Sequence, residues 1–516
     1  MFPKRVTNIS QSMTFNCTLS CIAGCVYVAS FYPKFCFWWL TPICIFVLYF
    51  SLVRSSSIKS SLVIFFVFCA LVMLSASFWI ASAIHNFTGA SYWPLLVLVW
   101  IFFSFVLALF LPGIAVSHIL DHTPLAFAAT FSISEYLRSR YAVGGTWFSF
   151  GYSQTYPSPL GMWAPVVGMN GINFIVIFFS ATLYHVIFNT EGRIKRVIIF
   201  LVFAGLSYYI KNINWTHPIS GLSHNVILVQ PNFPVLSAGK YSLSLDKVIH
   251  RYKLLMDNYT SADWVVFPEA GIPVTLIGKG DTFWPRFMKE VFHKFKHKPY
   301  LISGLHRLDD KGNLYNSMVL VNPEGVVEGV YDKVFLLPLG EYQWPWVRFF
   351  LRLHTGSGIS NYSEGYADQP TLNLGHESIA GNICYENAFS EYVRNRGELA
   401  TILLSISNDA WFGRSVAPHV HFQVGQMRSM ENGRPTLSVS NSGPTGYIGA
   451  NGDAELLPMF QSEVLKLKVV GYKGQTPFQK FHGDLGVLVG SILSLLILLL
   501  QKIHIKYQIF SFFTRR

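Results

Sequence analysis

Long apolar runs fill the first 210 residues of the chain, and one more lies near its carboxyl end. A helix that spans a bilayer needs about 20 mainly apolar residues, and the spacing of the polar interruptions predicts eight such helices. The predicted spans cover residues 15–33, 36–53, 61–84, 93–116, 123–137, 162–188, 197–210 and 485–501. The chain is therefore predicted to cross a membrane eight times, with one long polar segment between the last two crossings.

The polar segment, residues 211–484, has a different pattern, in which short β-rich runs alternate with amphipathic helices. Strands are predicted at 226–230, 264–267, 300–304, 317–321, 379–384, 402–407 and 436–440, and helices at 245–259, 283–295 and 421–432. Such alternation is typical of an α/β domain. The predicted organisation is a seven-helix membrane domain at 1–215, an α/β domain at 216–482, and a terminal helix with its tail at 483–516.

Composition excludes one class of protein. Of the 516 residues, 51% are hydrophobic and only 13% are charged, and the mean hydropathy is +0.38, so the chain is not one large soluble domain. Lys and Arg outnumber Asp and Glu by 39 to 27. The basic residues form short clusters beside apolar runs rather than one basic face, which indicates membrane orientation and not nucleic-acid binding.

The basic clusters also predict which way the chain faces, because cytoplasmic loops carry the excess of Lys and Arg. Clusters that fall together on one side lie at Lys4 and Arg5, at Arg54 and Lys59, at 193–196 and at 502–516. Arg138 and Arg140 fall on the other side and are the exception. Residues 211–484 are therefore predicted to lie outside the cytoplasm, and the first apolar run is expected to be a retained helix, not a cleaved signal peptide.

Six of the seven cysteines lie in the first 70 residues, within apolar runs, and only Cys384 lies in polar sequence. No disulfide framework is expected from this distribution. No metal is expected either, because no His or carboxylate joins Cys17, Cys21 and Cys25 in a ligand pattern. His419 and His421 are expected to have structural roles and not to bind a metal, since no third ligand is evident.

Three short strings place a reactive side chain at or just after the end of a predicted strand, where α/β folds build their sites. These side chains are Glu269, Lys333 and Cys384. They form a workable set for acyl transfer, in which Cys384 attacks a carbonyl, Glu269 takes the thiol proton and Lys333 stabilises the oxyanion. Glu341 and Glu386 are expected to orient Lys333 or the base.

Together these strings resemble the nitrilase superfamily and, within it, the apolipoprotein N-acyltransferases of bacterial inner membranes. A lone Cys-Tyr-Glu is a weak signal, whereas all the strings in order, framed by membrane spans, are a strong one. The matching strings are Gly151–Gln154, Phe267–Glu269, Tyr331–Lys333, Leu337–Tyr342, Ile383–Glu386, Ser407–Gly413 and Glu431–Pro435.

The resemblance implies a four-layer αββα fold outside the cytoplasm, in the periplasm, and an eight-helix bundle in the bacterial inner membrane. It implies that Glu269, Lys333 and Cys384 form the catalytic triad, with Glu341, Tyr385 and Glu386 assisting, and that no cofactor is needed. It further implies a ping-pong reaction. A phospholipid gives an acyl chain to the cysteine, and the thioester then acylates the amino group of a lipoprotein's diacylglyceryl-cysteine.

Some positions depart from the family pattern. Val334 and Phe335 replace residues that are often basic or His, and Ser438 stands where an Arg is common. These differences are expected to alter lid contacts or substrate preference while the triad spacing stays intact. The apolar and aromatic stretch 344–351 is interpreted as a lid or arm at the membrane interface, with core packing as the alternative.

Two rival functions fit part of the pattern. The same triad serves amidases and nitrilases, so one rival is a membrane-tethered hydrolase, although eight spans are excessive for a tether. The other rival is a transporter or scaffold whose outer domain only binds ligands, but the predicted spans hold few charged residues. Arg428, Glu431 and Arg434 lie at helical spacing and are interpreted as surface or subunit-like ion pairs that do not touch the substrate.

Overall fold

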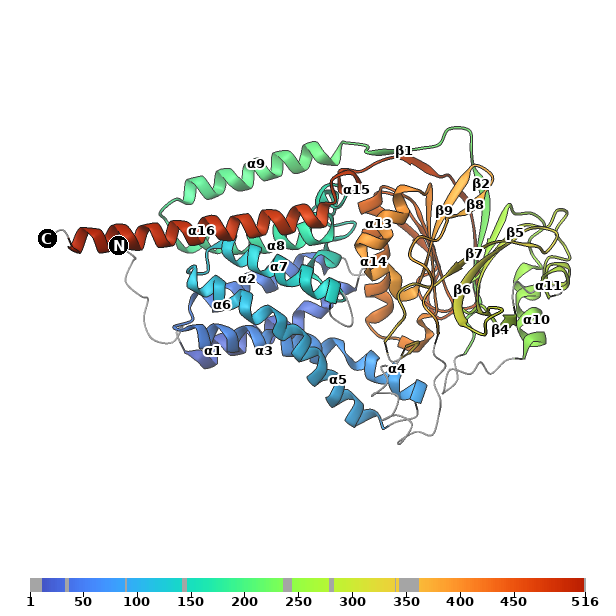
Figure 1. Cartoon of the computed structure of the whole chain (residues 1–516), viewed down its shortest axis with the longest axis horizontal. Helices are drawn as coiled ribbons and strands as arrows, with labels where there is room; N and C mark the ends of the chain where they lie inside the picture. Colours follow the sequence, from blue (N-terminus) through green and yellow to red (C-terminus); the bar gives the residue numbers. More distant parts are fainter. Residues whose placement is uncertain are drawn as a thin grey trace. The chain divides into compact units, whose positions relative to one another are not determined.

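The computed structural model describes residues 12–32, 37–88, 91–141, 146–234, 244–277, 283–338, 340–342 and 362–514. The chain forms two compact units, which Figure 1 traces in the colours of the sequence. The helical unit comprises residues 1–78, 97–213 and 480–516, and the sheet unit comprises residues 79–96 and 214–479.

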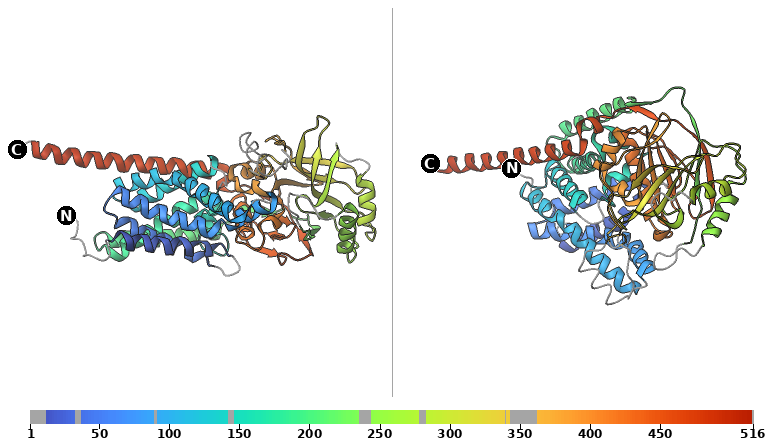
Figure 2. Two further views of the ribbon diagram at one scale, coloured as in Figure 1. Left: turned by 90° about the horizontal axis from the view of Figure 1, so that it is seen from below. Right: turned by 45° about the vertical axis from the view of Figure 1, so that its right-hand side comes forward.

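The helical unit is built from long helices joined by short turns. Its elements are α1 (Met13–Tyr27), η1 (Val28–Phe31), η3 (Phe37–Trp39), α2 (Leu40–Val53), α3 (Ile58–Ala76), the later part of α5 (Tyr92–Leu107), η4 (Ala108–Phe110), α6 (Leu111–Ile119), α7 (Pro124–Tyr141), η5 (Phe150–Gln154), η6 (Gly161–Trp163), α8 (Ala164–Phe188), α9 (Arg193–Lys211) and α16 (Gly483–Thr514). Helix α4 (Phe78–Thr88) and the start of α5 belong to the sheet unit. Helix α1 packs on α2 and α3, and α8 packs on α2 and α7. Helix α16 packs on α7 and α8 and extends beyond them (Figure 2).

Five helical stretches among the described residues are long and apolar enough to cross a membrane, and a shorter apolar one covers Phe37–Val53. The five are Met13–Phe31, Ile58–Ala76, Tyr92–Ile119, Gly161–Phe188 and Gly483–Ile505. The prediction of a protein with several membrane helices is confirmed, and the count of eight stays a prediction. The predicted span 61–84 is wrong as one helix, because α3 ends at Ala76 and α4 begins at Phe78.

Charged side chains in α7 form a buried ion pair. The predicted helix ends at residue 137, whereas α7 continues to Tyr141 and so contains Arg138. The Arg138 guanidinium donates to both oxygens of Glu135, at 2.6 and 3.0 Å, and also to the carbonyl of Trp147 and the hydroxyl of Ser149. Arg138, the exception to the charge rule, is therefore neutralised inside the unit.

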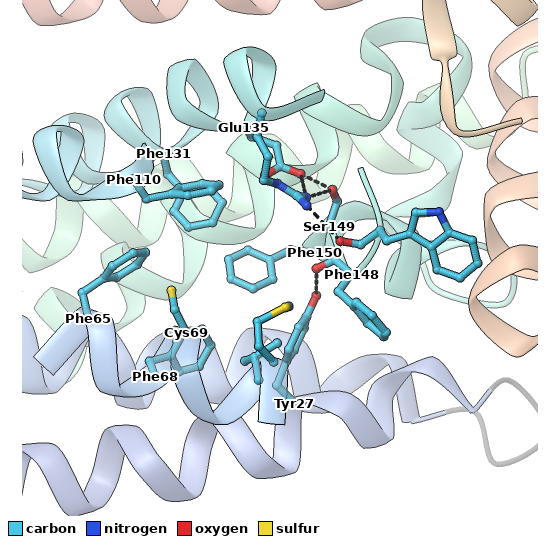
Figure 3. A pocket seen from close by; sticks show the side chains of 14 residues that line it. Tyr27, Phe65, Phe68, Cys69, Phe110, Phe131, Glu135, Phe148, Ser149 and Phe150 are labelled. Atoms are coloured by element: carbon cyan, nitrogen blue, oxygen red, sulfur yellow. Dashed lines mark hydrogen bonds and ion pairs between the residues drawn. The ribbon is translucent and has the colours of Figure 1, made fainter. Parts of the chain in front are cut away.

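This ion pair borders a small pocket with aromatic walls, drawn in Figure 3. The labelled rings come from α1, α3, η4, α7, η5 and the segment just before η5, and Cys69 lies among them. An unpaired charge in such apolar surroundings costs several kcal/mol, so each member of the pair depends on the other. The aromatic residues that line the pocket are Tyr27, Phe65, Phe68, Phe110, Phe131, Trp147, Phe148 and Phe150.

The sheet unit alternates strands and helices as predicted. Its remaining elements are β1 (Thr216–Pro218), β2 (His224–Gln230), α10 (Leu245–Met256), β3 (Trp264–Val266), β4 (Ile272–Ile277), α11 (Phe283–Val291), β5 (Tyr300–Leu308), β6 (Leu314–Val321), β7 (Val327–Asp332), β8 (Leu372–Leu374), β9 (Glu377–Ile383), η8 (Cys384–Ala388), α13 (Ser390–Glu398), β10 (Ile402–Ser407), η9 (Asp409–Phe412), α14 (Ala417–Asn432), β11 (Thr436–Ser440), β12 (Gly446–Ile448), β13 (Ala454–Leu456), β14 (Glu463–Val469) and β15 (Tyr472–Gly474). Helix α15 (Pro477–Phe481) follows at the boundary between the two units. Each of the seven predicted strands coincides with an observed one.

The strands form two main sheets. One has the order β14-β2-β3-β5-β6-β7, with β4 paired to β5, and the other has the order β13-β12-β11-β10-β9-β8. The central pairs β2-β3, β3-β5, β9-β10 and β10-β11 are parallel. Parallel strands are covered on both faces, which explains why they appear in the sequence as continuous apolar runs.

Side-chain alternation divides these strands between two cores. In β2, Val226 and Leu228 pack between the two sheets, whereas Ile227 and Val229 pack under α10 and α11. Helices α13 and α14 cover the other sheet, so the order of layers is helices, sheet, sheet, helices (Figure 1). The predicted αββα sandwich is confirmed.

Replacing Arg138 with Met is expected to destabilise the protein by about 3–5 kcal/mol, because Glu135 is left buried without its partner. Thermal unfolding in detergent would measure this as a lower midpoint. Lys195→Met changes an exposed cation on α9 and is the control, expected within about 0.5 kcal/mol of the wild type. Equal midpoints for the two variants would contradict a structural role for the pair.

Candidate active site

The three predicted reactive residues follow the ends of three strands. Glu269 lies three residues after β3, Lys333 directly follows β7, and Cys384 directly follows β9. Because β3 and β7 belong to one sheet and β9 to the other, the site draws on both sheets. Glu269 and Lys333 are buried, at 8% and 1% exposed, and Cys384 is partly exposed.

The Lys333 ammonium lies between two carboxylates. Its Nζ atom is 2.8 Å from Glu341 Oε2 and 3.6 Å from Glu269 Oε1. The Asn316 amide nitrogen donates to both carboxylates, at 2.8 Å to Glu269 Oε1 and 2.7 Å to Glu341 Oε1. The backbone N–H of Leu337 donates to the other oxygen of Glu341. A cation, two carboxylates and an amide thus form one network.

Glu269 is held from two further directions. Its Oε2 atom accepts a hydrogen bond of 2.9 Å from the backbone N–H of Asn408, just after β10. The next residue, Ala270, has a positive φ of 48°. Gly304 of β5 lies so close that a Cβ on it would be 2.6 Å from Glu269 Cα and 2.7 Å from the Pro268 carbonyl oxygen. Only glycine at 304 therefore allows the strand to pass under this turn.

Cys384 has a strained backbone. Its φ is 54°, a left-handed conformation that costs a non-glycine residue about 1–3 kcal/mol. The carbonyl of Cys384 accepts a hydrogen bond from His421 Nε2 at 3.2 Å. The chain turns sharply here, because β9 ends at Ile383 and η8 begins at Cys384.

The Glu386 carboxylate holds this turn through hydrogen bonds. Its Oε2 atom accepts from the backbone N–H of Ile383 and from the hydroxyl of Tyr331, both at 2.7 Å, and Oε1 accepts from the backbone N–H of Val334 at 2.6 Å. Glu386 thus joins the turn at Cys384 to the segment after Lys333. Tyr385 is buried and packs edge-on against Phe389, with ring centroids 5.1 Å apart.

The charges have a clear chemical consequence. Burial raises the pKa of the Cys384 thiol well above its ordinary value, and the Glu269 carboxylate adds to that rise, while Lys333 opposes it. Burial also raises the pKa of Glu269, against the opposing effect of Lys333. Burial works against the charge on Lys333, but Glu341 and Glu269 outweigh it and raise the pKa of the ammonium. The arrangement therefore combines a protonated thiol, a strengthened base and a permanent cation.

Comparison with known proteins shows the family to which the chain belongs. The model for the apolipoprotein N-acyltransferase N-terminal domain matches residues 23–182, and the model for carbon-nitrogen hydrolase matches residues 228–472. The apolipoprotein N-acyltransferase of Chromobacterium violaceum is 30% identical over 493 residues, which cover 93% of this chain and 92% of that protein. The chain belongs to the apolipoprotein N-acyltransferase family. The predicted resemblance is confirmed, and so is the expectation of an acyltransferase.

Other relatives extend the comparison. The apolipoprotein N-acyltransferase of Haemophilus influenzae is 29% identical over 445 residues, which cover 82% of this chain and 83% of that protein. Among solved structures, Nit3 of Saccharomyces cerevisiae, a member of branch 10 of the nitrilase superfamily, is 17% identical with a TM-score of 0.37, and the match covers 48% of this chain and 90% of that one.

The contribution of several residues around the site was not predicted from the sequence. Asn316 interrupts an apolar strand, and that interruption is a signal that could have identified it. Asn408 acts through its backbone N–H, which no side-chain pattern reveals. His421 is predicted as the first residue of a helix, whereas α14 begins four residues earlier, at Ala417. Pro418 in the first turn of α14 is the missed signal for the helix start.

The charged residues on and just after α14 differ from their prediction. Arg428, Glu431 and Arg434 are buried, at 1%, 0% and 3% exposed, so the prediction of surface ion pairs is wrong. Their helical spacing indicates that Arg428 pairs with Glu431, at 3.1 Å, but not that the pair is buried. Among the described residues, no group of three His, Cys, Asp or Glu side chains has metal-binding geometry.

Two residues that depart from the family pattern, Phe335 and Ser438, make contacts within the fold. Phe335 stacks on Phe389 with ring centroids 4.0 Å apart. Ser438 donates to the carbonyl of Pro444 at 2.9 Å and lines a small polar cavity that Asp409 also borders. The predicted lid at 344–351 lies outside the described residues.

Replacing Gly304 with Ala is expected to lower acyl-transfer activity at least about 10-fold, because the new Cβ displaces the backbone of Glu269; a 1 Å misplacement of a reacting group can cost about 100-fold in rate. Gly425→Ala is the matched control, since a Cβ there makes only an ordinary 3.4 Å contact with Ile448. Steady-state assays of both purified variants would check this. A folded Gly304→Ala protein with wild-type activity would disprove the constraint.

Proposed function

We propose that the chain is a phospholipid-dependent apolipoprotein N-acyltransferase that carries the acyl group as a thioester on Cys384. The observation that carries this proposal is the Lys333 ammonium, which lies 3.6 Å from the Glu269 carboxylate, together with Glu386, which joins the segment after Lys333 to the turn at Cys384. The names of the relatives support N-acylation of lipoproteins as the overall reaction.

In the first half-reaction, Glu269 takes the proton from the Cys384 thiol, and the sulfur attacks the ester carbonyl of a phospholipid. The new C–S bond forms, and Lys333 stabilises the negative charge on the carbonyl oxygen. The ester C–O bond then breaks, and the lysophospholipid leaves with the proton held by Glu269. The raised pKa of Glu269 suits it to both transfers, since a base works best with a pKa near the working pH.

In the second half-reaction, the amino group of a lipoprotein's diacylglyceryl-cysteine attacks the thioester carbonyl. A C–N bond forms and the C–S bond breaks. Glu269 accepts the proton from the amine and returns it to the sulfur of Cys384. The products are an amide on the lipoprotein and the free enzyme, so the reaction is ping-pong and needs no cofactor.

The assisting residues act through position. Glu341 is assigned the role of holding Lys333, to which it makes the shorter contact of 2.8 Å. Glu386 is assigned the role of fixing the turn at Cys384 through the N–H of Ile383. Tyr385 follows the nucleophile directly and is assigned to the wall of the acyl site.

The main alternative is hydrolysis, because the match to carbon-nitrogen hydrolase covers the same residues. Acyl transfer is favoured by the five apolar helical stretches in the same chain. Both proposed substrates are anchored in lipid, so an enzyme held in the bilayer meets them without extracting either into water.

Phosphatidylethanolamine with a labelled acyl chain is expected to label the wild-type protein on Cys384, as mass spectrometry of the peptide would detect. Cys384→Ala should carry no label. Glu269→Gln and Lys333→Met should form the acyl-enzyme at least about 100-fold more slowly, because proton transfer and oxyanion stabilisation each contribute about that factor or more.

The matched controls are Cys25→Ala, Glu290→Gln and Lys311→Met, which change the same residue types at solvent-accessible positions outside the network around Lys333. All three should label at the wild-type rate. Full lipoprotein acylation by Cys384→Ala would disprove the thioester, and unaltered function of that variant in cells without any acyl transfer would favour a scaffold role. Ammonia release from small amides without any label on the enzyme would favour hydrolysis.

We further propose that the helices span the bacterial inner membrane eight times and that residues 211–484 face the periplasm. Reporter fusions made after Ile210 and after Lys502 are expected to report the periplasm and the cytoplasm respectively, because the basic clusters at 193–196 and 502–516 remain inside. Two fusions that report the same compartment would contradict this topology.

A further inference from the structure

His421 is a buried group that neither the proposed triad nor its carboxylates use. It lies on α14 and is 7% exposed. Its Nδ1 atom is 2.9 Å from Asp409 Oδ1, and its Nε2 atom donates to the carbonyl of Cys384 at 3.2 Å. One side chain therefore connects a carboxylate on η9 to the backbone of the proposed nucleophile.

Both ring nitrogens of His421 face oxygens that accept hydrogen bonds. A carbonyl oxygen only accepts, and an ionised carboxylate only accepts, so each ring nitrogen carries a proton and donates. Asp409 is itself fixed, since Ser407 Oγ and Ser440 Oγ donate to its other oxygen at 3.3 and 3.4 Å. The ring of His421 is thus held on both edges.

The segment that holds His421 also holds the proposed base. Asn408 donates its backbone N–H to Glu269, and Asp409 is the next residue. The backbone N–H of Asp409 in turn donates to Ser440 Oγ at 3.3 Å. Through these two neighbouring residues, one short segment after β10 fixes the position of the base directly and the position of the nucleophile through His421.

We propose that His421 is a positioning residue that holds Cys384 in its left-handed conformation by donating to its carbonyl. The φ of 54° at Cys384 is unfavourable for a residue with a side chain, so it persists only where the surroundings hold it. A bond to the Cys384 carbonyl fixes the peptide plane that follows the nucleophile, and with it the direction of the thiol. This inference rests on the proposed role of Cys384.

Two substitutions separate the two bonds of His421. In His421→Gln the amide nitrogen takes the place of Nε2 and keeps the bond to the Cys384 carbonyl. In His421→Asn the amide nitrogen takes the place of Nδ1 and keeps the bond to Asp409 only. Both variants remove the positive charge and are amides of similar polarity, so each is the control for the other.

The rate of label transfer to Cys384 and the KM for the phospholipid would be measured for both variants, with unfolding midpoints as a check of folding. His421→Gln is expected to keep the acylation rate within about 5-fold of the wild type. His421→Asn is expected to lose at least about 10-fold in rate with KM nearly unchanged. Equal losses in two folded variants, or a loss only in His421→Gln, would overturn the proposal.

Asp409→Asn gives an independent test that also serves if His421→Asn does not fold. The new amide at position 409 would donate to an unprotonated Nδ1, which leaves Nε2–H bonded to the Cys384 carbonyl without the positive charge. The acylation rate is expected to stay within about 5-fold. A loss of about 10-fold or more would show that charge, not position, is what His421 contributes. Full activity of Cys384→Ala would instead overturn the proposed function itself.

Discussion

The arrangement of the site depends on one interaction, the sharing of the Lys333 ammonium between two carboxylates. A buried cation is tolerated only where it is paired, and Lys333 is 1% exposed. The two contacts are unequal, at 2.8 Å to Glu341 and 3.6 Å to Glu269. Glu341 therefore neutralises most of the charge, and Glu269 is the carboxylate left with the weaker partner.

This inequality explains how one network provides both a cation and a base. With two carboxylates and one ammonium, the group has a surplus of negative charge, and burial makes that surplus costly. The cost falls on the less well paired Glu269, whose pKa is raised. Asn316, which donates to both carboxylates, sets the distance between them. The interaction that stabilises the buried charge thus also prepares Glu269 for its proposed role as the base.

The sequence predicted the parts of this site that depend on local pattern. Apolar runs identified the central strands, and the strand ends identified Glu269, Lys333 and Cys384. Contacts between distant segments were not predictable in the same way. The hydrogen bond from Asn408 to Glu269 joins residues 139 positions apart and uses only backbone on the Asn408 side. Likewise, nothing local indicates that residue 304 must lack a Cβ, yet a Cβ there would be 2.6 Å from Glu269 Cα.

Charged residues were the least predictable, because a charge pattern does not reveal burial. Arg428 and Glu431 have the spacing of a surface pair and are buried, and Arg138 appeared as an exception to a loop rule and is a partner of Glu135 inside a helix. In each case the carboxylate lies one turn away on the same helix, a spacing that suits an exposed pair and a buried pair equally. The spacing identifies the partner, and only the apolar residues of neighbouring helices decide whether water reaches it.

The same physical reasoning bears on the choice between acyl transfer and hydrolysis. A thiol, a base and a cation make a thioester whether the next nucleophile is water or an amine, so the triad alone does not determine the product. A base such as Glu269, whose pKa is raised by burial, serves either nucleophile, because water and an amine each give up a proton when they attack. What distinguishes the two is access to the thioester. The long apolar helical stretches among the described residues favour a lipid-anchored acceptor, since a substrate held at the bilayer need not be extracted into water.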